Sequence, residues 1–231
     1  MSAADTPAGR RRGTLADQPA TAARPRGTLA LYRDDGPLAR TIGTAARPIA
    51  TRLPHMLLTT LAVAPMFVLI AAKGADTSRA AAGIAIAWLV LVAGIGGGQE
   101  PTDRLRWAVP PTIRLAEYAG ILWIGAMGGE SSEPAAFTLI CALAFRHYDV
   151  VYRLRHQGVA PPQWVGDLAL GWDGRLVLGY ILLVAGALPA GFFIAAGLLA
   201  TVFVAESIAG WRRFGRGQQP VTYEDEEDEG Q

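Results

Sequence analysis

The sequence predicts an all-α polytopic membrane protein with six transmembrane helices, a disordered N-terminal tail and a disordered, acidic C-terminal tail. Three observations lead to this fold class. Apolar residues make up 51% of the 231 residues and charged residues only 18%, a balance typical of membrane proteins. The apolar residues gather in runs that approach or reach the length of a span. The charged residues gather between these runs.

The two ends of the chain differ from its centre in composition. Residues 1–30 are rich in Ala, Arg, Pro, Thr and Gly without apolar periodicity, which predicts a disordered tail. Residues 31–52 combine arginines with apolar residues at helical spacing, which predicts a juxtamembrane amphipathic segment. Residues 214–231 form a second tail, whose last eight residues include six acids. The membrane domain is therefore expected to comprise residues 53–213.

Six apolar segments within the membrane domain are each expected to form one spanning helix. Pro110-Pro111 offers a natural start for the third, and the fourth is expected to continue beyond the membrane through Leu154. Several segments are short or glycine-rich, which suits close helix packing. The segments are Leu53–Ala72, Ala80–Gly97, Pro111 to about Met127, about Ala135 to Arg146, about Gly174 to Leu188, and Ala190 to about Trp211, with Pro189 alone between the last two.

The positive residues are distributed as such a topology requires. If the N-terminus is cytoplasmic, 19 of the 21 Lys and Arg residues fall on the inside, and only Lys73 and Arg79 fall outside. Positive charge concentrates on the cytoplasmic side of membrane proteins. The sequence thus predicts a multi-pass protein of the inner (plasma) membrane with both termini in the cytoplasm.

Ionisable residues gather at the predicted cytoplasmic border. At helical spacing Arg146, Asp149 and Arg153 share one face, and Asp149 is within reach of both arginines. Ionisable groups at a span usually face a cavity or one another, and arginines bind phosphate through bidentate hydrogen bonds. We therefore expect a cytoplasmic-side pocket for a phosphorylated head group. The candidate ligand-binding residues are Arg104, Arg114, Glu117, Arg146, His147, Asp149, Arg153, Asp173, Arg175 and Glu206.

Other interpretations of these residues stay open. They can form structural ion pairs between helices, or the arginines can extend independently to lipid phosphates. Acids such as Asp103 and Asp173 are suitable ligands for Mg²⁺. No spacing of His and Cys fits zinc, and the single Cys141 excludes a cysteine cluster. Gln99 stands where the glycine run at 94–98 would need the third glycine of a dinucleotide-binding fingerprint, so we expect no such site there.

The hexapeptide Asp35 to Arg40, DGPLAR, resembles the first half of the CDP-alcohol phosphotransferase motif. Enzymes of that family have six spans and an active site that faces the cytoplasm. The rest of the motif differs, because an aspartate is replaced by Tyr32, a glycine by Ile49, and two aspartates by Leu53 and Leu57. The carboxylates that hold the metals are absent, so that reaction is not expected from this motif.

Residues 100–213 are similar to an uncharacterised actinobacterial polytopic membrane domain. That domain is often fused to nucleotidyltransferase and CDP-alcohol phosphotransferase modules. The resemblance implies an association with phospholipid or phospho-polyol synthesis, and a partner of one of those two kinds. It is carried by the strings Asp103–Pro111, Ala116–Tyr118, Arg146–Arg153 and Gly171–Arg175.

The expected function is that of an integral membrane protein, accessory to phospholipid or phospho-polyol metabolism, with membrane lipid and no nucleic acid as its ligand. Two alternatives stay open: a membrane phosphotransferase-like enzyme that uses Mg²⁺, and a small transporter. The sequence does not decide whether the chain is an enzyme, and it indicates no catalytic residue. Convergence of the acids at the border, Asp103, Glu117, Asp149 and Asp173, would favour the enzyme.

Overall fold

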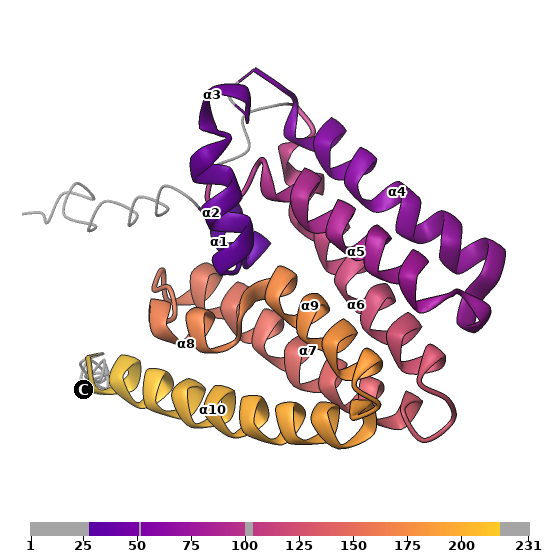
Figure 1. Ribbon diagram of the computed structural model, residues 1–231. Coiled ribbons are helices and arrows are strands. Elements are labelled where there is room, and N and C mark those ends of the chain that lie inside the picture. Colours follow the sequence, from indigo (N-terminus) through magenta and orange to yellow (C-terminus); the bar gives the residue numbers. More distant parts are fainter. Residues whose placement is uncertain (1–27, 51, 100–103, 218–231) are drawn as a thin grey trace, which may run out of the picture.

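The computed structural model describes residues 28–50, 52–99 and 104–217, and within these ranges every regular element is a helix (Figure 1). The predicted all-α class is confirmed. Residues 1–27 and 218–231, which include most of the two predicted tails, lie outside the described residues. The helices are α1 (Thr28–Arg33), α2 (Pro37–Ala45), α3 (Arg47–Ala50), α4 (His55–Lys73), α5 (Arg79–Gly94), α6 (Val109–Met127), α7 (Glu133–His156), α8 (Gln163–Leu168), α9 (Gly171–Val184) and α10 (Leu188–Gly217), with single 3₁₀ turns η2 (Gly74–Asp76) and η3 (Arg106–Ala108).

The long helices run back and forth between two ends of the molecule. In Figure 1, α4 packs along α5 and against α6, α6 packs against α7 and α9, and α10 lies along α7. The short helices α1 and α2 lie at one end, in contact with α5, α6, α7 and α9. This end also holds the C-terminal ends of α7 and α10. We call it the polar end, because the ionisable residues of the border gather there.

Prolines stand at the starts of several helices, and a glycine forms the turn between the last two. Pro37, Pro110 and Pro134 stand in the first turns of α2, α6 and α7, where the missing proline N–H leaves no hydrogen bond unmade. Pro189 was expected to separate the last two segments, but it lies in the first turn of α10, which begins at Leu188. The chain instead turns at residues 185–187, where Gly186 has a φ of 68° that few other residues adopt.

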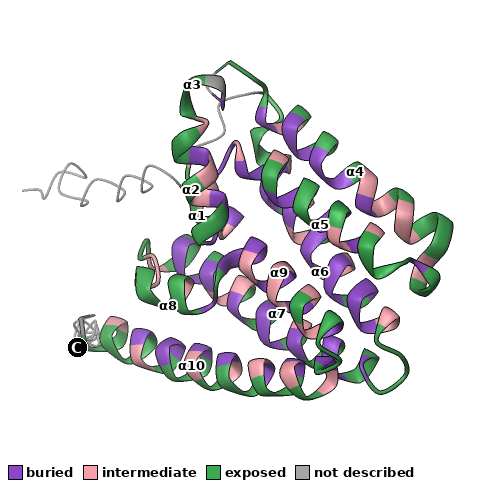
Figure 2. Ribbon diagram, viewed as in Figure 1, coloured by how far each residue is buried: buried purple, intermediate pink, exposed green. Residues whose placement is uncertain are grey.

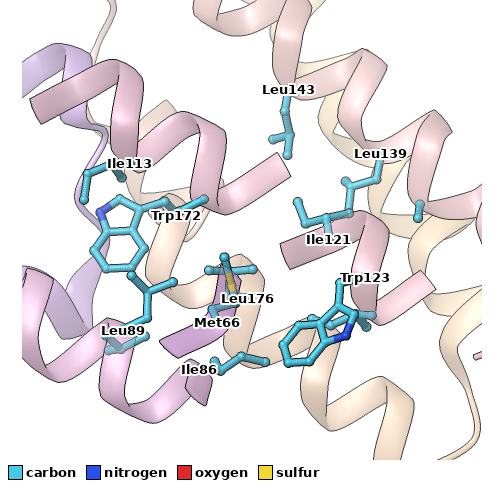
Figure 3. Packing of buried hydrophobic residues seen from close by; sticks show 14 of the residues in the cluster. Met66, Ile86, Leu89, Ile113, Ile121, Trp123, Leu139, Leu143, Trp172 and Leu176 are labelled. Atoms are coloured by element: carbon cyan, nitrogen blue, oxygen red, sulfur yellow. The ribbon is translucent and has the colours of Figure 1, made fainter. Parts of the chain in front are cut away.

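The core lies where α4, α5, α6 and α9 meet. Met66, Leu89, Ile113 and Leu176 are completely buried there, and Trp172 is 1% exposed (Figure 3). Their side chains come from these four helices, and Trp172 lies at the start of α9, beside the polar end. The core therefore fixes the position of the polar residues that flank it.

Two described helical segments are long and apolar enough to cross a membrane, His55–Asp76 and Leu188–Arg216. The expectation of six spans is supported at these two segments and not at the other four. Helices α5 and α9 have 16 and 14 residues, fewer than the roughly 20 that a bilayer requires. Helices α6 and α7 are long enough, but ionisable residues within them lower their hydropathy.

The N-terminus of α2 is capped by a side chain that lies 137 positions away in the sequence. Its own N-cap residue, Gly36, has no side chain to do so. The carboxylate of Asp173, on α9, accepts hydrogen bonds from the N–H groups of Gly36 at 2.5 Å and of Leu38 and Ala39 at 3.0 Å. These N–H groups have no partner within α2 itself. Asp173, predicted as a ligand-binding residue, thus attaches α2 to α9.

Replacing Asp173 by alanine should destabilise the protein strongly. Three N–H groups at a buried helix start would lose their acceptor, which costs about 2–3 kcal/mol of unfolding free energy. Denaturant unfolding of the purified protein in detergent measures this loss. Asp167→Ala is the control, because the half-exposed Asp167 pairs with Arg40 at the surface and should contribute less than about 1 kcal/mol. Equal losses in both variants would contradict the capping role.

Candidate functional site

The turn between α1 and α2 places the carboxylate of Asp34 at the polar end. Asp34 has a left-handed backbone with φ 55°, which aspartate adopts more readily than most residues. Its carbonyl accepts the N–H of Trp172 at 3.2 Å. Beside it, Gly36 packs directly against Gly171, and a Cβ on either residue would collide with the backbone of the opposite segment. The turn is therefore held closely against the start of α9.

Four basic side chains from α6, α7 and α9 surround the Asp34 carboxylate. The closest is Arg175, whose Nη2 lies 2.8 Å from Oδ2. Arg114 Nη1 and His147 Nε2 each lie 3.6 Å from the same oxygen. Arg146 Nη2 lies 3.9 Å from Oδ1. Basic groups from three helices that are distant in the sequence thus lie around one carboxylate.

A second carboxylate, Glu117, engages two of these arginines. It is completely buried in α6, and it accepts Arg175 Nε at 2.5 Å and Arg114 Nη1 at 2.8 Å. Each arginine also donates to a backbone carbonyl, Arg175 to Ala169 and Arg114 to Tyr32, both at 2.9 Å. Both guanidinium groups are therefore held by several acceptors at once.

Arg146 is the arginine of this cluster that forms no hydrogen bond among the described residues. Its side chain is only 9% exposed, yet among the described residues its Nε has no hydrogen-bond partner. The 3.9 Å to Asp34 exceeds hydrogen-bond distance. Its guanidinium instead lies over the ring of Phe203, 5.0 Å from the centroid. A buried guanidinium with unused donors is a binding group for an anion.

The charges of this cluster do not cancel. The Tyr118 hydroxyl lies 2.6 Å from His147 Nδ1, which suits a neutral ring that accepts the hydroxyl hydrogen at Nδ1 and carries its own proton on Nε2. Three arginines, Arg114, Arg146 and Arg175, then face the two carboxylates of Asp34 and Glu117. The cluster carries one net positive charge.

A cavity of about 590 Å³ opens beside this cluster. It is lined by α1, by the starts of η3 and α6, by the end of α7 and by the segment before and within α8. Cavities of about 300–1,000 Å³ are typical of small-molecule sites. The residues of the cluster that line it are Asp34, Arg114, Arg146 and His147.

The pKa of Asp34 shows which effect dominates in the cluster. Burial by itself raises the pKa of this carboxyl, because it disfavours the charged form. The positive charges of Arg175 and Arg114 and the neighbouring His147 ring outweigh that effect and hold the pKa well below its usual range. Asp34 is therefore ionised throughout the physiological pH range.

The neighbouring acid, Asp35, has a structural role. It accepts Arg33 Nε at 2.9 Å, Trp172 Nε1 at 2.8 Å and the N–H of Gly98 at 2.9 Å. Arg33 in turn donates to the carbonyl of Ala93 at 2.7 Å. These bonds join the α1–α2 turn to the end of α5 and to α9, so they keep Asp34 in place.

A second ionic group lies between α7 and α10. Arg153 donates to both oxygens of Glu206, at 2.6 and 3.2 Å. Asp149 lies 3.4 Å from Arg153 and accepts the hydroxyl of Ser207 at 2.8 Å. This group ties the ends of the two helices together.

The structure thus divides the predicted site residues. Asp149 was expected to orient both Arg146 and Arg153, but it contacts Arg153, and Arg146 turns toward Asp34 instead. Asp173 is the cap of α2, and Arg104 is exposed in the turn before η3. Around Asp34 lie Arg114, Glu117, Arg146, His147 and Arg175, whereas Asp149, Arg153 and Glu206 form the second group.

Sequence reasoning missed the residue at the centre of the site. Asp34 and Asp35 belong to a stretch that indicates a turn, and their partners are up to 141 positions away. The available signal was the pair of adjacent acids in an otherwise arginine-rich segment.

The sequence assigned no metal site and left Mg²⁺ binding by acids at this border open as an alternative. In the described residues, no group of three or more His, Cys, Asp or Glu side chains is arranged to hold a metal ion. Asp103, one of the acids considered for Mg²⁺, lies outside those residues. Glu117, Asp149 and Asp173 each accept hydrogen bonds from arginine, serine or backbone donors.

The fold and the site define an all-α protein with a buried, net positive cluster beside a cavity at one end of the bundle. The chain matches a family of unknown function, DUF5941, over residues 22–229, and it belongs to that family. No curated protein and no solved structure matches it. The expectation of an uncharacterised family is confirmed, whereas an actinobacterial origin and fused modules stay predictions.

The stability that Asp34 contributes should depend on pH. Asp34→Asn removes a counter-charge of Arg175 and should lower the unfolding free energy by about 3 kcal/mol near pH 7. Because the folded pKa lies below the unfolded value of about 3.9, this contribution is complete above that value and is lost as the pH falls through the folded pKa. The difference between wild type and variant should be constant from about pH 5 to 8 and narrow below about pH 4.

Unfolding curves of both proteins at pH 3, 5 and 7 measure this effect. The control is Asp76→Asn, at an exposed acid on the opposite end of the molecule, which should change stability little at any of these pH values. A difference for Asp34→Asn that persists unchanged at pH 3 would show that its carboxylate charge is not what stabilises the fold.

Proposed function

We propose that this protein is a multi-pass membrane protein that binds a phosphorylated head group in the cavity beside Asp34. The observation that carries the proposal is Arg146, a buried guanidinium with unused donors on the wall of a 590 Å³ cavity. The cluster behind it has one net positive charge. A phosphate would accept hydrogen bonds from Arg146 and neutralise that charge.

The outer surface of the helices supports a membrane location. Figure 2 shows many exposed residues along the long helices, and among the large apolar residues there Ile84 is 72% exposed, Val68 63% and Leu198 64%. In the most apolar windows of the segments His55–Asp76 and Leu188–Arg216, only 33% and 28% of residues are buried. The core helix of a water-soluble protein would turn more of its apolar surface inward. A lipid bilayer would cover this surface.

The orientation follows from the charges. Of the described Lys and Arg residues, only Lys73 and Arg79 lie at the end opposite the cavity, in the connection between α4 and α5. By the positive-inside rule the polar end then faces the cytoplasm. In this proposal α5, α6, α7 and α9 also lie within the membrane, packed between the two apolar segments and thinning it locally where they are short.

Binding fits the site better than phosphoryl transfer does. The described acids of the cluster are engaged by arginines or by backbone N–H groups, which leaves the basic groups as the ones able to take a ligand. A phosphotransferase would need carboxylates free to hold Mg²⁺ near the phosphate. We therefore propose an accessory role in phospholipid or phospho-polyol metabolism, in which the protein holds a phosphorylated head group or intermediate.

Arg146→Lys should weaken the binding of a phosphate monoester. Lysine keeps the positive charge but cannot make the bidentate contact, so the Kd for methyl phosphate should rise about tenfold to a hundredfold. Isothermal titration calorimetry of the purified protein measures it. The control is Arg155→Lys on the same helix, because Arg155 is exposed and its substitution should leave the Kd unchanged. Equal Kd values for wild type and Arg146→Lys would contradict the proposed site.

The proposed topology can be tested by cysteine accessibility on a Cys141→Ser background. Single cysteines at Ala75 and Ser131 should react with an impermeant maleimide added to intact cells, because both exposed residues lie at the end opposite the cavity. A cysteine at Val159, which is 51% exposed at the polar end, should react only after the cells are opened. Labelling of Val159 from outside would overturn the topology.

A further inference from the structure

A second cavity, of about 360 Å³, lies between α7, α9 and α10. Its walls are leucines, alanines, a valine and a phenylalanine, with Arg175 as the one charged residue among the described residues that line it. An apolar cavity of this size offers few partners to water or to an ion. It suits a hydrocarbon group.

The shape of this cavity is elongated along the bundle. On α10 the lining extends from Phe192 to Val202, and ten residues of helix correspond to about 15 Å. Leu168 and Arg175 lie at the polar end of the cavity, and Leu139 on α7 lies deeper in the bundle. The cavity therefore runs in the direction that a lipid chain takes in a membrane.

The cavity is also open toward the side of the molecule. Leu198 and Leu168, two of its lining residues, are 64% and 51% exposed. A chain could enter laterally from the bilayer without passing through the core. A peptide segment is a poor occupant, because a lining with so few polar groups would leave its backbone N–H and C=O groups without partners.

The polar end of this cavity meets the anion site. Arg175 lines the apolar cavity and also contacts Asp34, which lines the first cavity. The guanidinium of Arg146 lies over the ring of Phe203, which follows Val202 on α10. Arg175, through Asp34, and Phe203, beside Val202, therefore lie between Arg146 and the apolar cavity.

From this arrangement we infer that the second cavity holds a hydrocarbon chain of the same molecule whose phosphate lies beside Arg146. The ligand class is then a phosphorylated amphiphile, a lipid phosphate, and not a free phosphate ester. The inference rests on the proposed head-group site. It adds that the chain contributes to binding, so that affinity depends on chain length.

A homologous series of alkyl phosphates tests this inference. The protein is held in amphipol, without detergent micelles that would absorb the probe, and titrated with methyl, butyl, hexyl and octyl phosphate. Each methylene that enters the cavity should tighten binding about fourfold. If methyl and octyl phosphate bind with equal affinity, the chain site is overturned and the head-group site stands. If no member of the series binds, the proposed function itself fails.

Ala195→Phe locates the chain. Ala195 lines the cavity on α10, so a phenyl ring there should fill it, remove most of the gain from methyl to octyl phosphate, and leave the Kd for methyl phosphate unchanged. Ala205→Phe is the matched control, because Ala205 is exposed on the same helix and does not line the cavity. It should bind the whole series like wild type.

A second variant separates chain binding from misfolding. Leu198→Ala truncates an exposed side chain at the cavity wall, so it should preserve the melting temperature while it lowers the affinity for octyl phosphate several-fold. An octyl phosphate Kd that is unchanged in both Ala195→Phe and Leu198→Ala would place the chain elsewhere and overturn the inference.

Discussion

The structure depends on the buried side chain of Arg175. Its guanidinium reaches the Asp34 carboxylate at 2.8 Å, the Glu117 carboxylate at 2.5 Å and the Ala169 carbonyl at 2.9 Å. Removing a charge from water costs several kcal/mol, and only several well-placed acceptors offset that cost. Because these acceptors come from the α1–α2 turn, from α6 and from the segment before α9, one side chain determines how the N-terminal helices sit on the bundle.

The same arrangement leaves Arg146 without a hydrogen-bonded carboxylate. Arg175 and Arg114 take up the two carboxylates, so Arg146 faces Asp34 only at 3.9 Å and stacks on Phe203. This surplus arginine on a cavity wall is the basis of the proposed head-group site.

The sequence predicted the features that depend on local patterns. The apolar runs located the long helices to within a few residues, and the Arg114–Glu117 pair follows from i,i+3 spacing and is formed at 2.8 Å. It could not predict contacts between distant segments, such as Arg175 with Asp34, 141 positions apart. The i,i+4 spacing made Asp149 a partner for Arg153, but the stronger bond of Arg153, to Glu206, comes from α10. Segment length alone could not decide the number of spans, since a short apolar run such as α9 does not by itself define a span.

The cap on α2 has a consequence for how the chain assembles during synthesis. Leu38 and Ala39 are synthesised early. The Asp173 carboxylate that accepts hydrogen bonds from their N–H groups emerges from the ribosome about 135 residues later. Until Asp173 has been synthesised, the start of α2 lacks this acceptor. It also lacks Gly171, at the start of α9, against which Gly36 packs. The docking of the N-terminal helices is therefore a late step that closes the polar end only after most of the bundle has been synthesised.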